Sequence, residues 1–378
     1  MAAFLASLFA SSFTAFLIVR FHHIHGHLTA DHVGSGPQKF HDRPVPRVGG
    51  VAVMVGVAAA VGLMEQAGTL SFGYAMVLAL CAFPSFLSGL AEDMTKRVSV
   101  LARLLMTMVA ASLAFFLLDA RLVKLSLPGV DSLLTFVPIS LAVTMIAVAG
   151  ISHAMNIIDG FNGLSGVVSL MILLSLAFIS HMVGDPMLMQ LLLAIAGGIA
   201  GFLLWNFPRG QLFLGDGGAY FIGFVIAESS VLLVKNHPEV SPWFPMLLVV
   251  YPVWETIFSA YRRKVVSGVS SGTADALHLH SLIYRRLLRG TGAWRNARTS
   301  PYLWSLNTFA FVPALLFWRE TPVLMASALA FILIYLWLYR SIVRFRTPCW
   351  LAVKKTDQRS VRAIKPEADK YSPLKKGL

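Results

Sequence analysis

Residues 155–182, MNIIDGFNGLSGVVSLMILLSLAFISHM, place a short polar run directly before a long apolar one. The apolar part, residues 164–182, has the length that a helix needs to cross the hydrocarbon core of a membrane, about 20 mainly apolar residues. Similar segments recur along the 378 residues, of which 57% are hydrophobic and only 13% charged. An ordinary soluble domain is about 25% charged. The chain is therefore predicted to be an integral membrane protein.

The predicted fold is an all-α polytopic membrane protein with about eleven transmembrane helices. No small-residue cleavage site follows the first apolar segment, so we expect this segment to remain as a helix. One membrane unit, residues 1–345, precedes a polar, basic tail, residues 346–378. The predicted spans lie near residues 2–19, 49–64, 72–90, 100–118, 134–154, 164–182, 187–205, 218–234, 243–260, 303–317 and 322–340.

The 31 Lys and Arg residues predict the orientation of these spans. With the N-terminus outside, the outer loops hold Arg121, Lys124, Lys235 and Arg319, and the other 27 (31 − 4) lie inside. Because Lys and Arg favour the cytoplasmic side, we expect the N-terminus outside and the C-terminus in the cytoplasm. The net charge of +13 suits anionic membrane lipids and phosphorylated substrates, and no segment resembles a nucleic-acid-binding module.

The polar run at the start of the quoted stretch carries Asn156, Asp159 and Asn162. Their spacing of three residues would place them on one face of a helix. A carboxylate at membrane depth is costly and therefore indicates a functional site. The alternative is a loop between two membrane helices, with polar side chains that face water.

A second acidic motif, Glu92-Asp93, ends the predicted span at residues 72–90. Adjacent carboxylates repel each other and shift each other's pKa unless a cation lies near them. The motif is thus a candidate site. The alternative is that Asp93 caps its helix and pairs with Lys96 or Arg97.

A glycine-rich motif, Gly215-Asp216-Gly217-Gly218, precedes another span and follows Asn206 and Phe213. Glycines at a helix N-terminus expose backbone N–H groups that can bind phosphate. Asp216 could hold a divalent cation, because Mg²⁺ takes one or two protein carboxylates and completes its shell with water and substrate phosphates. A simple capped turn is the alternative.

Two basic loops complete the set. The first, residues 20–47, contains a histidine cluster that we interpret as a solvated loop, then Lys39 and an extended Pro-Val-Pro segment before Arg47. Lys39 and Arg47 could contact phosphate or act as positive-inside anchors. The second, residues 261–302, contains His278 and His280. The alternating leucines and cations from Leu277 onward predict an amphipathic helix on the inner leaflet.

His278 and His280 would diverge on a helix but align on an extended segment. Zinc would require more ligands than this pair, so phosphate contact is the better functional interpretation.

All these polar motifs fall on the inner side of the predicted topology, which indicates one active site that faces the cytoplasm. Carboxylates, amides, glycine-rich turns, histidines and cations suit magnesium-dependent phosphoryl-type transfer, which depends on positioning and charge neutralisation. A transporter of lipid-linked or anionic solutes is the alternative. It would predict polar residues deep within broken helices.

The motifs together resemble the polyprenyl-phosphate N-acetylhexosamine-1-phosphate transferases, glycosyltransferase family 4, the MraY/WecA group. The resemblance extends from Asp31 to Arg289. The run of residues 156–164 is similar to the family's Asn-x-x-Asp-Gly-x-Asp-Gly-Leu signature. Four positions depart from the family's pattern, and they bear on nucleotide and sugar preference more than on reaction type: Glu92, Asn162, Ala219 and Ser281.

The resemblance implies transfer of a sugar 1-phosphate from a UDP-sugar to undecaprenyl phosphate, with release of UMP, to start a lipid-linked cell-envelope glycan. It implies a multi-pass protein of the bacterial inner membrane that uses Mg²⁺, with Mn²⁺ as an alternative. Whether the chain forms a homodimer is left open.

The resemblance also implies residue roles. Asp216 and Asn156, with Asp159 as a further candidate, would position the metal ion. The implied catalytic residues are Asp93, Asp159, His278 and His280, and the implied substrate-binding residues are Lys39, Glu92, Asn162, Asn206 and Phe213. Asp93 would face the lipid phosphate as a base or as an orienting group. Both roles stay open because a phosphate monoester, with a second pKa near 6, is mostly dianionic at pH 7.

Overall fold

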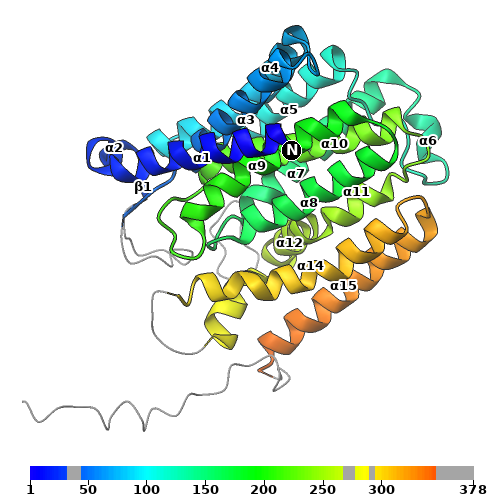
Figure 1. Ribbon diagram of the computed structural model, residues 1–378. Coiled ribbons are helices and arrows are strands. Elements are labelled where there is room, and N and C mark those ends of the chain that lie inside the picture. Colours follow the sequence, from blue (N-terminus) through cyan, green and yellow to red (C-terminus); the bar gives the residue numbers. More distant parts are fainter. Residues whose placement is uncertain (32–43, 267–276, 289–293, 346–378) are drawn as a thin grey trace, which may run out of the picture.

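The computed structural model describes residues 1–31, 44–266, 277–288 and 294–345. These residues form a bundle of helices and one short antiparallel pairing of β1 (Ala30–Asp31) with β2 (Val45–Pro46) (Figure 1). The helices are α1 (Ala2–Arg20), α2 (His22–Thr29), α3 (Gly49–Gln66), α4 (Phe72–Thr95), α5 (Val100–Leu117), α6 (Val130–Leu133), α7 (Val137–Ile158), α8 (Leu164–Met182), α9 (Pro186–Asn206), α10 (Gly215–Asn236), α11 (Trp243–Leu248), α12 (Val250–Tyr261), α13 (Leu279–Leu282), α14 (Ser300–Leu316) and α15 (Thr321–Val343). Single turns of other helix types occupy Arg262–Val266, Ile283–Leu287 and Ala297–Thr299.

Within the described residues, nine helices are long and apolar enough to cross a membrane. They are α1, α3, α4, α5, α7, α8, α9, α10 and α15, and they correspond to nine of the predicted spans. The predicted class, an all-α polytopic membrane protein, is confirmed.

Shorter helices occupy the two remaining predicted spans. One contains α14, which has 17 residues. The other is divided into α11 and α12. Pro252 causes this interruption, because it has no N–H group to donate to the carbonyl oxygen of Leu248, four residues earlier.

Helix α10 is the central element of the bundle. In the most apolar 18-residue stretch of α10, 89% of the residues are buried, compared with 17% in the corresponding stretch of α1. Helix α10 is therefore surrounded by protein, whereas α1 lies at the periphery. It packs against α3, α4, α7 and α8. Figure 1 shows α10 within the bundle, with α4 and α5 along one side and the adjacent pair α14 and α15 along the other.

Glycines bring two neighbouring backbones very close to the first turn of α10. A Cβ atom on Gly50 of α3 would lie 2.4 Å from the Cα atom of Gly218, and one on Gly89 of α4 would lie 2.5 Å from the carbonyl carbon of Asp216. Small residues at such crossings allow membrane helices to approach closely. The approach places the end of α4 and the residues before α3 directly beside the Gly215-Asp216 motif.

Two sequence predictions about the loops need correction. The segment from residue 20 to residue 47 begins with a helix, α2, instead of a loop, although its extended Pro-Val-Pro segment is confirmed by strand β2. The amphipathic helix predicted from Leu277 is present but shorter than expected, as Leu279–Leu282 in α13 and a π-helical turn at Ile283–Leu287. Its position on a surface is wrong, because its apolar side chains are buried in the bundle.

Candidate active site

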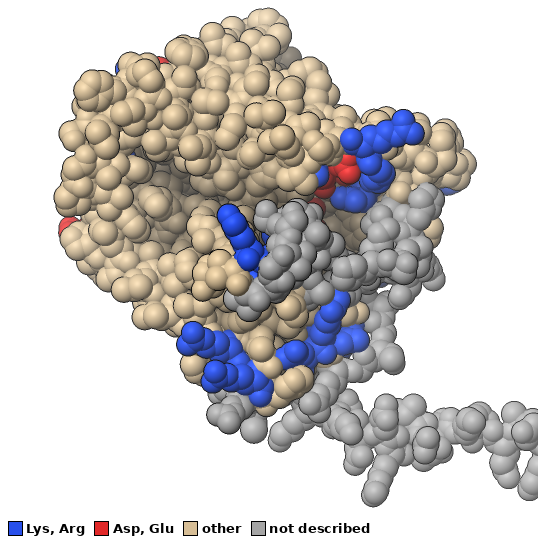
Figure 2. All heavy atoms as spheres, turned by 180° about the vertical axis from the view of Figure 1, so that it is seen from behind, with Lys and Arg blue, Asp and Glu red and all other residues tan. Residues whose placement is uncertain are grey.

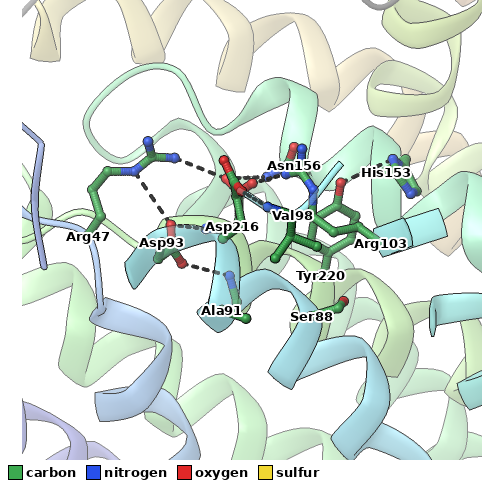
Figure 3. Close-up of polar contacts among 12 residues, drawn as sticks. Arg47, Ser88, Ala91, Asp93, Val98, Arg103, His153, Asn156, Asp216 and Tyr220 are labelled. Atoms are coloured by element: carbon green, nitrogen blue, oxygen red, sulfur yellow. Dashed lines mark hydrogen bonds and ion pairs between the residues drawn. The ribbon is translucent and has the colours of Figure 1, made fainter. Parts of the chain in front are cut away.

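Asp216, the second residue of α10, is the centre of a buried ionic cluster (Figure 3). Its Oδ1 atom accepts hydrogen bonds from Nη2 of Arg47 and from Nδ2 of Asn156, each at 3.0 Å. Its Oδ2 atom accepts a hydrogen bond from Nη1 of Arg103. Four segments that are distant in the sequence therefore meet at one carboxylate.

Asp93 caps the N-terminus of α10. Its Oδ1 atom accepts a hydrogen bond from the N–H group of Asp216 at 3.0 Å, and its Oδ2 atom accepts one from the N–H group of Gly217 at 2.9 Å. The Nε atom of Arg47 lies 3.6 Å from Asp93 Oδ1. Asp93 is only 1% exposed, so this contact is part of the protein interior. Asp93 thus caps a helix, as the alternative interpretation of the sequence proposed, but the helix is α10 and not α4, to which Asp93 belongs.

Arg103 is a site residue that the sequence interpretation missed. It lies in the first turn of α5 and is 8% exposed. Its guanidinium carbon is 5.6 Å from the ring centre of Tyr220, whose hydroxyl is hydrogen-bonded to Nδ1 of His153 at 3.1 Å. An arginine so deeply buried must be paired. The presence of one arginine inside a predicted span was the signal that could have revealed it.

The central polar run forms the turn between α7 and α8. Only Asn156 lies on α7, because the helix ends at Ile158. Asn156, Asp159 and Asn162 therefore do not share one helix face. The alternative prediction, a loop between two membrane helices, describes the backbone correctly. The Asp159 carboxylate accepts a hydrogen bond from the Ser165 hydroxyl. Burial raises the pKa of Asp159 to about 6, while this hydrogen bond and the charge of Arg47 act in the opposite direction.

Asn206 and Asn162 connect this turn to the loop before α10. Asn206 Oδ1 accepts a hydrogen bond from the N–H group of Gly163 at 2.6 Å, and its Nδ2 donates to the Leu212 carbonyl oxygen at 2.8 Å. Asn162 Nδ2 donates to the Pro208 carbonyl oxygen at 3.1 Å. Both amide side chains thus hold backbone segments together.

The histidine motif reaches the same turn from the opposite side. The rings of His278 and His280 are stacked, with centres 5.0 Å apart and an angle of 14° between planes. His280 also packs edge-on against Phe161 at 5.4 Å. His278 precedes α13 in extended conformation, which explains why two histidines two residues apart face the same way. The expected alignment of the pair is present.

The remaining predicted residues take different positions. Glu92 Oε2 accepts a hydrogen bond from the N–H group of Val98 at 2.8 Å, in the turn between α4 and α5. The backbone of Phe213 bonds to Pro46 and Gly49, which joins the loop before α10 to the entry of α3. Lys39 lies outside the described residues.

The donor set fits a divalent cation that is shared with a ligand. Asp216 and Asn156, a carboxylate and an amide whose oxygens are of the kind that Mg²⁺ prefers, lie in contact through Nδ2 of Asn156. The described residues contain no group of three or more His, Cys, Asp or Glu side chains that could form a complete protein cage. Asp93 and Asp216 are balanced by Arg47 and Arg103, so an entering diphosphate would bring charge that needs a further cation.

An apolar groove of about 690 Å³ runs along α7, α10 and the α11–α12 interruption. Its lining extends from Leu122 and Leu125 to Gly150 and Ile151 of α7 and to Ile257 of α12. Ile151 lies five residues before Asn156 on the same helix, which corresponds to about 7.5 Å along the axis. On α10 the nearest lining residue, Ala227, is eleven residues from Asp216, about 16.5 Å along the axis, so the groove approaches the ionic cluster along α7.

The fold and this cluster define a polytopic membrane protein with a buried ionic cluster at the start of α10. Residues 75–234 match the model of glycosyl transferase family 4. This part of the chain is similar to that family.

Three relatives illustrate the similarity. The probable undecaprenyl-phosphate N-acetylglucosaminyl 1-phosphate transferase of Bacillus subtilis is 26% identical over 247 residues, which cover 64% of this chain and 66% of the relative. The undecaprenyl-phosphate alpha-N-acetylglucosaminyl 1-phosphate transferase of Thermotoga maritima is 28% identical over 68% of this chain and 73% of its own length. The decaprenyl-phosphate N-acetylglucosaminephosphotransferase of Mycolicibacterium smegmatis is 29% identical over 70% of each chain.

Proposed function

We propose that this chain transfers an N-acetylhexosamine 1-phosphate from a UDP-sugar to undecaprenyl phosphate and releases UMP, as the first step of a lipid-linked cell-envelope glycan. The observation that carries the proposal is the cluster of Arg47, Arg103, Asp93 and Asp216 at the N-terminus of α10, beside the central signature. The names of the relatives make N-acetylglucosamine the first sugar to test.

In the proposed reaction, an oxygen of the lipid phosphate attacks the phosphorus atom that carries the sugar. A new P–O bond forms, the P–O bond to the UMP phosphate breaks, and its electron pair leaves with UMP. The attacking oxygen is mostly deprotonated at pH 7, so the protein needs to supply orientation and positive charge more than a base.

The residues of the cluster would provide this charge from fixed positions. Arg47 and Arg103 would bind phosphate oxygens. Asp93, which accepts hydrogen bonds from the N–H groups of Asp216 and Gly217, would keep the start of α10 in place beside the ligand. Asp216 and Asn156 would hold Mg²⁺ or Mn²⁺, which when bound would neutralise the diphosphate charge. His278 and His280, with Lys39, would add positive charge from the other side.

The uracil of the donor would stack on Phe213. We assign Asn206 and Asn162 the role of holding the loop that carries Phe213, because their amide groups bond to backbone atoms on both sides of that loop. Glu92 supports the α4–α5 turn in the same way. These three residues would then affect donor affinity through loop position.

The apolar groove would hold the hydrocarbon chain of the acceptor. Its lining is almost entirely apolar, and on α7 it ends at Ile151, five residues before Asn156. A polyprenyl chain in the groove would place its phosphate beside the cluster. The same lining argues against transport of an anionic solute, although the α11–α12 interruption is a feature that a transporter could share.

We further propose that the site faces the cytoplasm of a bacterial inner membrane. Figure 2 shows Lys and Arg side chains gathered toward one end of the visible face, beside the acidic side chains, whereas most of this face is uncharged. Such an asymmetry is typical of the cytoplasmic end of a membrane protein.

The test is incubation of purified full-length protein with Mg²⁺, undecaprenyl phosphate and a panel of UDP-sugars, with UMP release as the readout. We expect release with a UDP-N-acetylhexosamine and its loss in Asp216→Asn. Repeating the assay without added Mg²⁺, in the presence of a chelator, tests the metal. No release with any UDP-sugar would overturn the proposed function, and full activity of Asp216→Asn would overturn the metal assignment.

A further inference from the structure

Glu255 of α12 is a buried carboxylate that the proposed reaction does not use directly. It is 1% exposed and lies beside the histidine motif. Its Oε1 atom is 3.0 Å from Nδ1 of His278 and accepts a hydrogen bond from the N–H group of Leu279 at 3.2 Å. Its Oε2 atom accepts one from the Tyr335 hydroxyl at 2.8 Å. Glu255 therefore joins α12, the start of α13 and α15 at one point.

These contacts determine the state of the His278 ring. A buried carboxylate is stable only when its oxygens receive hydrogen bonds or face a positive charge. Because an ionised carboxylate can only accept, Nδ1 of His278 carries the proton in its bond to Glu255. The opposite ring nitrogen, Nε2, then points away from Glu255.

The orientation is passed on to the second histidine. His280 stacks on His278 and contacts Phe161, within the turn that follows Asp159. A Cβ atom on Gly160 would lie only 3.5 Å from Nε2 of His280. Movement of His278 would therefore displace His280 from the central signature.

We propose that Glu255 and Tyr335 are positioning residues that hold the His278–His280 pair, with a defined proton position on His278, against the turn at residues 159–163. The inference rests on the proposed function, in which these histidines face the diphosphate. It gives α12 and α15, which lie outside the matched residues 75–234, a part in the site. In many protein sites, a carboxylate orients a functional histidine by accepting a hydrogen bond from the ring nitrogen that does not face the ligand.

The electrostatic surroundings of the pair come from two segments. Glu255 and Tyr251 belong to α12, and Tyr335 and Tyr339 belong to α15. Of these, Glu255 is the group that carries a negative charge at neutral pH. Its removal should therefore cost more activity than removal of a tyrosine hydroxyl, which takes away one hydrogen bond and no charge.

The chain offers matched control variants. Glu228, in the middle of α10, is also a buried carboxyl, 4% exposed, and neither of its oxygens has a hydrogen-bond partner among the described residues. Tyr251 is as buried as Tyr335, and its hydroxyl likewise has no partner there. Glu228→Gln and Tyr251→Phe thus repeat the chemical changes of Glu255→Gln and Tyr335→Phe without breaking a described contact.

The experiment measures UMP release against pH for wild type, Glu255→Gln, Glu255→Asp and Tyr335→Phe. Loss of a residue that orients a functional side chain typically lowers activity about 10- to 100-fold, and we expect this range for kcat of Glu255→Gln. We also expect an altered pH–rate profile in this variant, partial recovery of kcat in Glu255→Asp, and a smaller decrease in Tyr335→Phe. Both controls should behave as wild type.

The outcomes separate this inference from the proposed function. If the wild-type protein releases no UMP from any UDP-sugar, the proposed function is refuted. If the wild type is active and Glu255→Gln has the same kcat and pH profile, the positioning role alone is overturned. A decrease in kcat of Glu228→Gln as large as that of Glu255→Gln would also overturn it. If Glu255→Gln fails to fold, judged by gel filtration in detergent, the comparison of Tyr335→Phe with Tyr251→Phe decides: equal kcat values would refute the inference.

Discussion

Asp93→Asn tests whether Asp93 acts by holding α10 or as a base. The asparagine can keep one acceptor oxygen, but its NH₂ group must then face the N–H group of Gly217, which loses its acceptor. Leaving a buried donor unsatisfied costs about 1–3 kcal/mol. Loss of a negative charge at the α10 N-terminus adds about 0.3–2 kcal/mol. We expect a total destabilisation of about 1–5 kcal/mol.

The activity of the same variant should fall because the N–H groups of α10, Arg47 and Asp216 lose their common support. If Asp93 only orients these groups, the acidic limb of the pH–rate profile stays at the wild-type position. The assays are thermal unfolding in detergent and UMP release between pH 5 and 9. Asp119→Asn, in an exposed ion pair with Arg121, is the matched control and should change stability by less than about 1 kcal/mol. Wild-type thermal stability in Asp93→Asn, or loss of the acidic limb, would refute the orienting role.

Three further predictions concern other parts of the site. Arg103→Met should destabilise the protein by about 3–5 kcal/mol, because it leaves the buried Asp216 carboxylate without one of its cations. Arg103→Lys should recover part of this stability. Equal melting temperatures of the Met and Lys variants would contradict the ion pair. Asp159 has a raised pKa of about 6, so the folded state binds its proton more tightly than the unfolded chain, and its contribution to stability falls as pH rises from about 4 to 6 and is constant above. The difference in melting temperature between wild type and Asp159→Asn should follow that course, and a difference independent of pH would refute it. Gly150→Leu should raise KM for undecaprenyl phosphate but not for the UDP-sugar, because a Cβ atom at Gly150 meets no atom within 4 Å and the leucine would occupy the groove. The control is Gly62→Leu, at a position that is equally open but lies outside the groove. An unchanged KM in Gly150→Leu would exclude the groove as the acceptor site.

Several features were predictable from local sequence. The spans follow from apolar length alone, which is why nine of them appear as continuous long helices. Asn156 and Asp216 were recognised because polar residues and glycines at the ends of apolar segments are conspicuous. Their direct contact confirms that these two motifs lie together.

Other features depended on packing. Asn206 and Asn162 were predicted to bind substrate, but the structure uses their amides to join two backbone segments, and nothing in a local pattern distinguishes these uses. Arg103 and Glu255 stood out only as charges near apolar residues. Their partners, Asp216 and His278, are contributed by other elements of the fold.

The sequence by itself determined the class of the protein, the positions of its spans and the kind of chemistry its motifs can support, because apolar length and residue type act over short segments. Only the tertiary structure decided that Asp93 caps α10, that Arg47 and Arg103 balance Asp216, and that Glu255 holds His278. These contacts arise because close approach at Gly50 and Gly89 brings α3 and α4 against α10, and the interruption before α12 places Glu255 behind α13. Such crossings depend on which helices pack together, a property of the whole chain that no single stretch contains.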